Sequence, residues 1–112
     1  MYVHLKFKKM ENLSNKQWKE LIAKTKDYVV LDVRTSEECE QGIIPEAIQI
    51  DFLASHDFVS AVEDLDKSKT YFVYCRSGNR SAQACLYMNM KGFKTYNLTE
   101  GITAWDGKII AN

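Results

Sequence analysis

The chain has 112 residues, of which 46% are hydrophobic, and this length and composition suit one domain with one modest core. Its 15 basic and 15 acidic side chains cancel, which argues against a global positive field for nucleic acid or an anionic membrane. No apolar run approaches the length that spans a bilayer, so we expect neither nucleic acid nor a membrane as a partner.

The first predicted elements are a helix and a buried strand. Residues 2–7 alternate weakly, which fits either a short edge strand or a loosely ordered arm. Ser14 and Gln17 have the spacing of a capping box, and apolar residues follow at helical spacing, which predicts a helix over residues 15–25. Residues 28–33 are apolar and rich in β-branched side chains, the pattern of a strand buried on both faces of a parallel sheet.

The middle of the chain alternates again between helix and strand. Residues 36–38 begin a short acidic helix, which Gly42 and Pro45 end. Residues 47–50 predict another short strand. The apolar spacing within residues 56–65 then predicts an amphipathic helix.

A buried strand over residues 70–74 leads directly into Cys75, and a helix is predicted after it. Gly92 stands where a left-handed residue would cap that helix. The apolar stripe of the helix is predicted to consist of Ala82, Cys85, Leu86 and Met90.

Residues 93–98 predict the last strand and residues 101–105 a final short helix. Strands that alternate with helices predict an α/β fold, with a central parallel sheet and helices on both faces. Functional loops of such sheets lie beyond the carboxyl ends of the strands, and Cys75 stands at such an end.

The loop after this strand has the composition of an anion-binding site. Only three arginines occur in the chain, and Arg76 and Arg80 both lie within five residues of Cys75. Arginine offers a planar fork for oxyanions, and loop amides together with a helix N-terminus add positive potential. Such surroundings lower the pKa of a thiol, so we predict that Cys75 is a nucleophilic thiolate. The loop reads Cys75-Arg76-Ser77-Gly78-Asn79-Arg80-Ser81.

Five segments, in this order along the chain, closely resemble a single-domain rhodanese. They are residues 31–34 (Leu-Asp-Val-Arg), 37–38 (Glu-Glu), 42–47 (Gly-Ile-Ile-Pro-Glu-Ala), 73–82 and 101–105 (Gly-Ile-Thr-Ala-Trp). The resemblance implies the rhodanese-like fold in one domain over residues 1–112, with a core at about residues 13–106. It also implies transfer of sulfane sulfur through a cysteine persulfide.

Carried over to this sequence, the resemblance makes Cys75 the catalytic residue. The segment Arg76, Ser77, Gly78, Asn79, Arg80 and Ser81 would bind the substrate, its amides cradling the persulfide and its two arginines holding an anionic donor such as thiosulfate. Asp32 and Arg34 would form a supporting pair behind the loop. The acceptor would be cyanide, a thiol or a partner protein, and no metal or organic cofactor is implied.

Three positions depart from the family pattern. Ile43 stands where relatives have histidine, and Glu46 and Glu100 stand where they have glycine. None of the three lies in the cysteine loop, so the departures bear on loop shape or a partner surface.

Two other classes of function remain open. Cysteine phosphatases and arsenate reductases also use a cysteine and an arginine, but their pattern is Cys-x5-Arg, whereas four residues separate Cys75 from Arg80. A rhodanese-like binding module without chemistry would be expected to lack the cysteine. A relay that passes sulfur to another protein has the same residues as a small-molecule sulfurtransferase.

The remaining cysteines and histidines predict no second site. Cys39, Cys75 and Cys85 lack Cys-x-x-Cys spacing, which indicates neither disulfides nor zinc and fits reduced thiols in the cytoplasm. Cys39 and Cys85 are predicted to be packed and inert, and His4 and His56 have no partner at ligand-like spacing. Without a heptad or a long apolar face, we expect a monomer.

Overall fold

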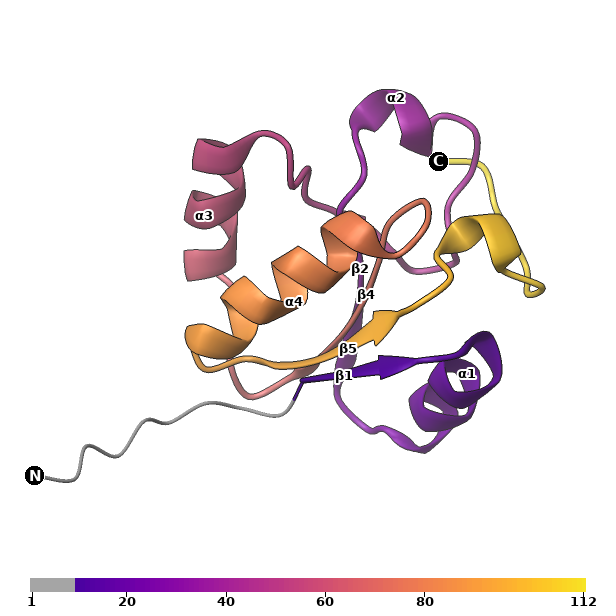
Figure 1. The fold of residues 1–112 in the computed structure, drawn as a ribbon, viewed down its shortest axis with the longest axis horizontal. Coiled ribbons are helices and arrows are strands. Elements are labelled where there is room, and N and C mark those ends of the chain that lie inside the picture. Colours follow the sequence, from indigo (N-terminus) through magenta and orange to yellow (C-terminus); the bar gives the residue numbers. More distant parts are fainter. Residues whose placement is uncertain (1–9) are drawn as a thin grey trace, which may run out of the picture.

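Five parallel strands form the sheet at the centre of the fold (Figure 1). The computed structural model describes residues 10–112, and the two interpretations of residues 2–7 lie outside this part. Within it, the strands lie in the order β1-β5-β4-β2-β3, and each neighbouring pair is parallel. The α/β prediction with a parallel sheet is therefore confirmed. The strands are Met10–Leu13 (β1), Tyr28–Asp32 (β2), Ile48–Gln49 (β3), Thr70–Tyr74 (β4) and Lys94–Leu98 (β5).

The edge strand β1 was not predicted. Its four residues contain no β-branched side chain, so propensity gives no signal there. It nevertheless pairs with β5 along its whole length, from Met10 opposite Thr95 to Leu13 opposite Leu98. Hydrogen bonding to β5, and not the propensity of the local sequence, therefore makes these residues a strand.

The helices confirm the predicted alternation, with shifts of a few residues at their ends. Ser14 and Gln17 form the expected capping box, because each side chain accepts a hydrogen bond from the other residue's amide. The final helix is a single 3-10 turn. No helix in residues 10–112 is long and apolar enough to cross a membrane. The helices are Asn15–Lys24 (α1), Ser36–Cys39 (α2), Ser55–Glu63 (α3), Asn79–Met90 (α4) and Ile102–Ala104 (η1).

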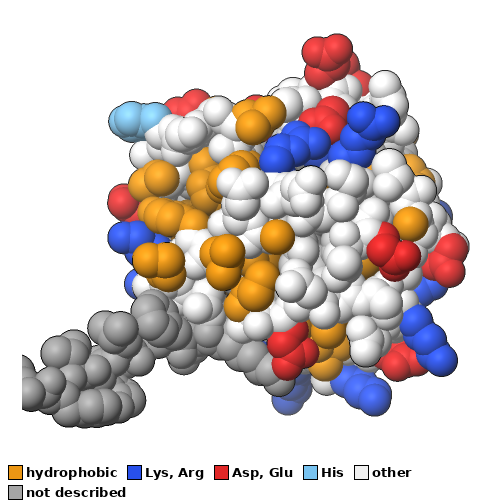
Figure 2. Space-filling model, in the orientation of Figure 1, with side chains coloured by type: hydrophobic (Ala, Val, Ile, Leu, Met, Phe, Trp, Pro, Cys, Tyr) orange, Lys and Arg blue, Asp and Glu red, His pale blue; other side chains and the backbone are white. Residues whose placement is uncertain are grey.

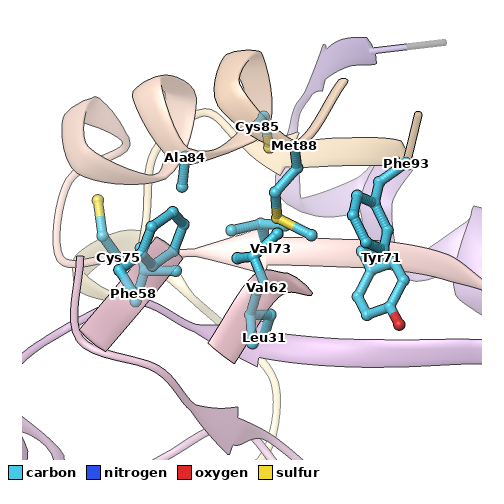
Figure 3. Packing of buried hydrophobic residues seen from close by; sticks show 11 residues of the cluster. Leu31, Phe58, Val62, Tyr71, Val73, Cys75, Ala84, Cys85, Met88 and Phe93 are labelled. Carbon is cyan, nitrogen blue, oxygen red and sulfur yellow. The ribbon is translucent and has the colours of Figure 1, made fainter. Parts of the chain in front are cut away.

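Each face of the sheet buries its own hydrophobic cluster. Tyr71 and Val73 of β4 point to the face covered by α3 and α4, where Phe58 and Met88 join them (Figure 3). Residues between them along β4 point to the other face, which α1 and η1 cover. That second cluster contains Leu13, Trp18, Val30, Ile44, Phe72, Tyr74, Tyr96 and Leu98. Burial on both faces explains why the central strands β2 and β4 are largely apolar.

The buried face of α4 differs from the predicted stripe. Leu86 and Met90 are 55% and 66% exposed, and Figure 2 shows hydrophobic side chains gathered on the side of the molecule where α3 and α4 lie. Instead the helix buries a row at helical spacing that begins with a serine: Ser81, Ala84, Cys85 and Met88. Apolarity alone misplaced the stripe because a polar residue, Ser81, faces inward to meet Cys75.

Candidate active site

Cys75 lies directly beyond the carboxyl end of β4, next to the start of α4. Its backbone continues the alternation of β4 and places the side chain on the face of α3 and α4, at the end of the hydrophobic cluster (Figure 3). The labelled sulfur points away from Val73 and Met88 in that view. The residue is 1% exposed, so its sulfur lies in a region of low dielectric constant, where a negative charge is unfavourable unless polar groups contact it.

Two hydrogen-bond donors contact this sulfur. The Gly78 amide nitrogen lies 3.1 Å from it and the Ser81 hydroxyl 3.3 Å from it. Burial alone raises the pKa of the Cys75 thiol, but hydrogen bonds from the Ser81 hydroxyl and from the amides of Ser81, Gly78 and Ser77 outweigh that effect. The net result is a pKa below its usual value, which is the direction that the predicted thiolate requires.

The loop needs glycine at position 78. Gly78 has a φ of +101°, and a Cβ atom there would lie 2.0 Å from the carbonyl oxygen of Thr99. This left-handed turn aims the Gly78 amide at Cys75 and also makes Gly78 the N-cap of α4. The close approach to the loop after β5 therefore shapes the sulfur site.

A second glycine closes the loop from behind. A Cβ atom on Gly101 would lie 2.2 Å from the carbonyl oxygen of Arg76. The next two amides bind the loop: Ile102 donates to the Cys75 carbonyl at 3.0 Å, and Thr103 to the Arg76 carbonyl at 3.2 Å. In the sequence, Gly101, Ile102 and Thr103 belong to a motif that carries no predicted role. Their contacts show that they hold the cysteine loop in position.

The predicted supporting pair is formed and buried. The Arg34 guanidinium donates to both carboxylate oxygens of Asp32, with its closest contact at 2.7 Å, and Asp32 and Arg34 are 0% and 5% exposed. Arg34 also donates to the Gly42 carbonyl at 2.8 Å and to the Glu38 carbonyl at 3.4 Å. Burial lowers the pKa of Arg34, but the hydrogen bonds and the charge of Asp32 outweigh this effect, so the pKa of Arg34 is raised and its guanidinium stays charged.

The structure places Arg80 in an ion pair that was not predicted. Its two terminal nitrogens donate to the two carboxylate oxygens of Glu38 on α2, at 2.7 and 2.8 Å. Chiefly through these bonds, the pKa of Glu38 falls to about 2. Charge alternation along the chain could not reveal this contact, because 42 residues separate the two partners.

Arg76 has a different setting. It is exposed and makes no salt bridge with any residue of 10–112. Its side chain lines a pocket of about 420 Å³ together with Glu38, Gln41 and Thr103. Ser77 and Asn79 are also exposed, so of the predicted substrate-binding residues only Gly78 and Ser81 lie buried against the sulfur.

The other cysteines are buried and weakly acidic. Burial raises the pKa of both Cys39 and Cys85 to about 12. Cys39 contacts a carboxylate oxygen of Asp32 at 3.4 Å, which also disfavours its thiolate. Both thiols are packed in the interior, as predicted, and their inertness stays a prediction. Within residues 10–112, no three His, Cys, Asp or Glu side chains gather as they would around a metal ion.

Two departures from the family pattern have local structural consequences. Glu46 has a φ of +73°, a conformation that favours glycine, which explains the residue found in relatives. Ile43 is buried and forms an antiparallel bridge with Ile110 near the C-terminus. Glu100 is exposed beside Gly101. All three lie outside the contacts of the Cys75 sulfur.

Known proteins share this fold and this sequence pattern. The model of the rhodanese-like domain matches residues 14–108, and the chain belongs to that family. A protein named "Sulfurtransferase" from Allochromatium vinosum is 40% identical over 85 residues, which cover 75% of this chain and 77% of that protein. "Putative sulfurtransferase YtwF" from Bacillus subtilis is 38% identical over 99 residues, covering 88% and 93%.

The crystal structure of a rhodanese-like domain protein from Staphylococcus aureus superposes with a TM-score of 0.77 at 28% identity, covering 92% of this chain and 99% of the other. Fold, sequence and relatives therefore define a sulfurtransferase of the rhodanese type at the level of the family.

Proposed function

We propose that this protein transfers sulfane sulfur from thiosulfate or a persulfide donor to a thiophilic acceptor through a persulfide on Cys75. The observation that carries this proposal is the pair of donors, the Gly78 amide and the Ser81 hydroxyl, that contact the Cys75 sulfur beside the N-terminus of α4. They stabilise negative charge on sulfur both before the reaction and in the persulfide.

The reaction divides into two displacements. The Cys75 thiolate attacks the outer sulfur of thiosulfate; a sulfur–sulfur bond forms to the enzyme, the one in thiosulfate breaks, and sulfite leaves with the electron pair. An acceptor such as cyanide or a thiolate then attacks the outer sulfur of the persulfide, and Cys75 leaves as the thiolate. The electrons balance without an added oxidant or reductant.

The size of the loop favours sulfur over phosphate chemistry. Gly78 and Ser81 contact a single atom, and four residues separate Cys75 from Arg80. A phosphatase cradle must surround three oxygens of a tetrahedral group, which the longer Cys-x5-Arg pattern supplies. We therefore keep cysteine phosphatase activity as an outcome of the test and not as a second proposal.

The test is the intact mass of the reduced protein after incubation with thiosulfate, with Cys75→Ser as the control and a phosphatase substrate in parallel. We expect the wild-type protein alone to gain one sulfur atom, which cyanide or a thiol removes. A reactive Cys75 without a sulfur adduct would contradict the proposal, and release of phosphate would favour the other chemistry.

We further propose that the protein acts as a monomer in the cytoplasm, where its three free thiols would stay reduced. The acceptor in the cell is a small thiol or a partner protein that presents one. A mass spectrum that shows the sulfur atom moving from persulfidated protein to an added thiol would support this assignment, and static light scattering measures the oligomeric state.

A further inference from the structure

The cysteine loop presents two arginines in unequal states. Arg80 makes two charge-assisted hydrogen bonds to Glu38, at 2.7 and 2.8 Å, whereas Arg76 has no acidic partner in residues 10–112. Two parallel bonds between a guanidinium and a carboxylate are the strongest geometry that such a pair adopts. An anion that approaches Cys75 therefore meets one free guanidinium and one that is already engaged.

Glu38 is held in place for this contact by three further bonds. Its carboxylate accepts from the Thr35 amide at 3.1 Å, which is one bond of the capping box of α2, and from the Thr35 hydroxyl at 3.2 Å. Its carbonyl accepts from Arg34 at 3.4 Å, and Arg34 is itself fixed by Asp32. Little side-chain entropy is then lost when Glu38 binds Arg80, so the ion pair persists.

From this arrangement we propose that Glu38 is a specificity-determining residue, which withholds Arg80 from anionic donors and leaves Arg76 as the loop arginine that binds them. The inference rests on the proposed sulfur transfer and adds a residue outside the cysteine loop to it. Arg80 becomes a positioning residue that ties α2 to the start of α4, and Arg76, which lines the 420 Å³ pocket together with Glu38, is left as the arginine that binds the donor.

The charges around the site lead to a preference among donors. Glu38 cancels the charge of Arg80, and Asp51 also interacts with Arg80. One uncompensated guanidinium then faces the donor, together with the amides around Cys75. Two free arginines would strongly favour dianionic thiosulfate over a singly charged persulfide. A site with one free arginine favours thiosulfate less. Because the pKa of Glu38 is about 2, this ion pair stays formed throughout the physiological pH range.

The experiment measures equilibrium binding of thiosulfate to the Cys75→Ser protein, which cannot react, at constant ionic strength. Adding Glu38→Gln keeps the capping box, since glutamine serves at that position, but removes the charge. We expect thiosulfate to bind about three to ten times more tightly, because Arg80 becomes available. Glu37→Gln is the matched control: it removes an equal charge from the exposed neighbour and should change binding less than twofold.

Two further variants separate the arginines. We expect Arg76→Met to weaken binding about tenfold or more, as loss of a charged contact does. The double variant Glu38→Gln with Arg80→Met removes the ion pair as a unit and should bind thiosulfate within twofold of the parent. A tenfold loss in that double variant would overturn the proposal, because Arg80 would then bind the donor despite Glu38. No gain in Glu38→Gln would also overturn it, because Glu38 would then not be what keeps Arg80 from the donor.

These outcomes differ from failure of the proposed function. A wild-type protein that gains sulfur from a persulfide but whose Cys75→Ser form never binds thiosulfate contradicts the role of Arg76 and leaves sulfur transfer intact. Conversely, the variants could show the predicted order of affinities while Cys75 never accepts sulfur. That result would support the roles assigned to the two arginines and contradict sulfur transfer.

Discussion

Removing the hydroxyl of Ser81 should make Cys75 less acidic without changing the shape of the loop. Ser81 is fully buried, and its hydroxyl donates to the Cys75 sulfur at 3.3 Å. In Ser81→Ala that bond disappears, while the Gly78 amide, 3.1 Å from the sulfur, remains. The backbone amide of residue 81 also remains, because alanine supports the first turn of a helix as well as serine does.

The size of the effect follows from the difference between two hydrogen bonds. A hydrogen bond to a charged group contributes about 1.5–3 kcal/mol, and one between neutral groups about 0.5–1.5 kcal/mol. The difference is about 1–2 kcal/mol in favour of the thiolate, so the acid dissociation constant of the Cys75 thiol should be about fivefold to thirtyfold smaller in Ser81→Ala. At pH values below the pKa of the thiol, the thiolate fraction falls by the same factor. A more basic thiolate is also more nucleophilic, which reduces the loss in alkylation rate to about twofold to sevenfold.

The assay is the pH dependence of Cys75 alkylation, followed by mass spectrometry. Cys39 and Cys85 do not interfere near neutral pH, because burial raises the pKa of each to about 12. Ser77→Ala is the matched control, since Ser77 acts on Cys75 through its backbone amide. A Ser81→Ala profile that coincides with that of Ser77→Ala would refute the reasoning, because the hydroxyl would then contribute nothing to the thiolate.

Three other substitutions test the rest of the structure by chemical denaturation. Glu46→Gly should stabilise the protein by about 0.5–1 kcal/mol, because it relieves a φ of +73°, whereas Glu46→Ala keeps the strain and should not. Gly78→Ala should destabilise it by about 2–4 kcal/mol, since its Cβ would lie 2.0 Å from the Thr99 carbonyl oxygen; an equally stable variant would show that the loop moves freely. Because Arg80 lowers the pKa of Glu38 to about 2, their pair stabilises the protein above about pH 4.5, and this contribution is lost as the pH falls toward 2. Glu38→Gln should therefore lose less stability than the wild type between pH 5 and about pH 2, and equal losses would contradict the assignment.

Much of the fold could be predicted because the central strands carry a local signal. Residues 28–33 and 70–74 are apolar except for Asp32 and Thr70, and burial on both faces of a parallel sheet favours this pattern. The strand β1 has no apolar, β-branched run that would predict it. Its four residues form a strand because they pair with β5. Tertiary pairing, not propensity, determines that element.

The candidate site was predictable where neighbours in sequence are neighbours in space. Cys75 and the loop to Ser81 contact each other within six residues, so the strand, loop and helix order predicts an acidic thiol. The contacts that hold this loop come from elsewhere: Gly101 approaches the Arg76 carbonyl, and Glu38 binds Arg80 across 42 residues. No spacing rule connects such partners.

The wrong stripe on α4 and the unexpected ion pair have a common cause. Polar side chains in this site are turned toward polar partners: the fully buried Ser81 toward the Cys75 sulfur, and the half-buried Glu38 toward Arg80. A rule based on apolar periodicity assigns buried positions to apolar residues. It therefore fails where a buried polar side chain donates a hydrogen bond to a group that can carry charge. The exposed Leu86 and the buried Ser81 both follow from one orientation of α4, in which its first turn presents a hydroxyl to the Cys75 sulfur. The departure from simple apolar patterning thus marks the same residues that chemistry at Cys75 would need.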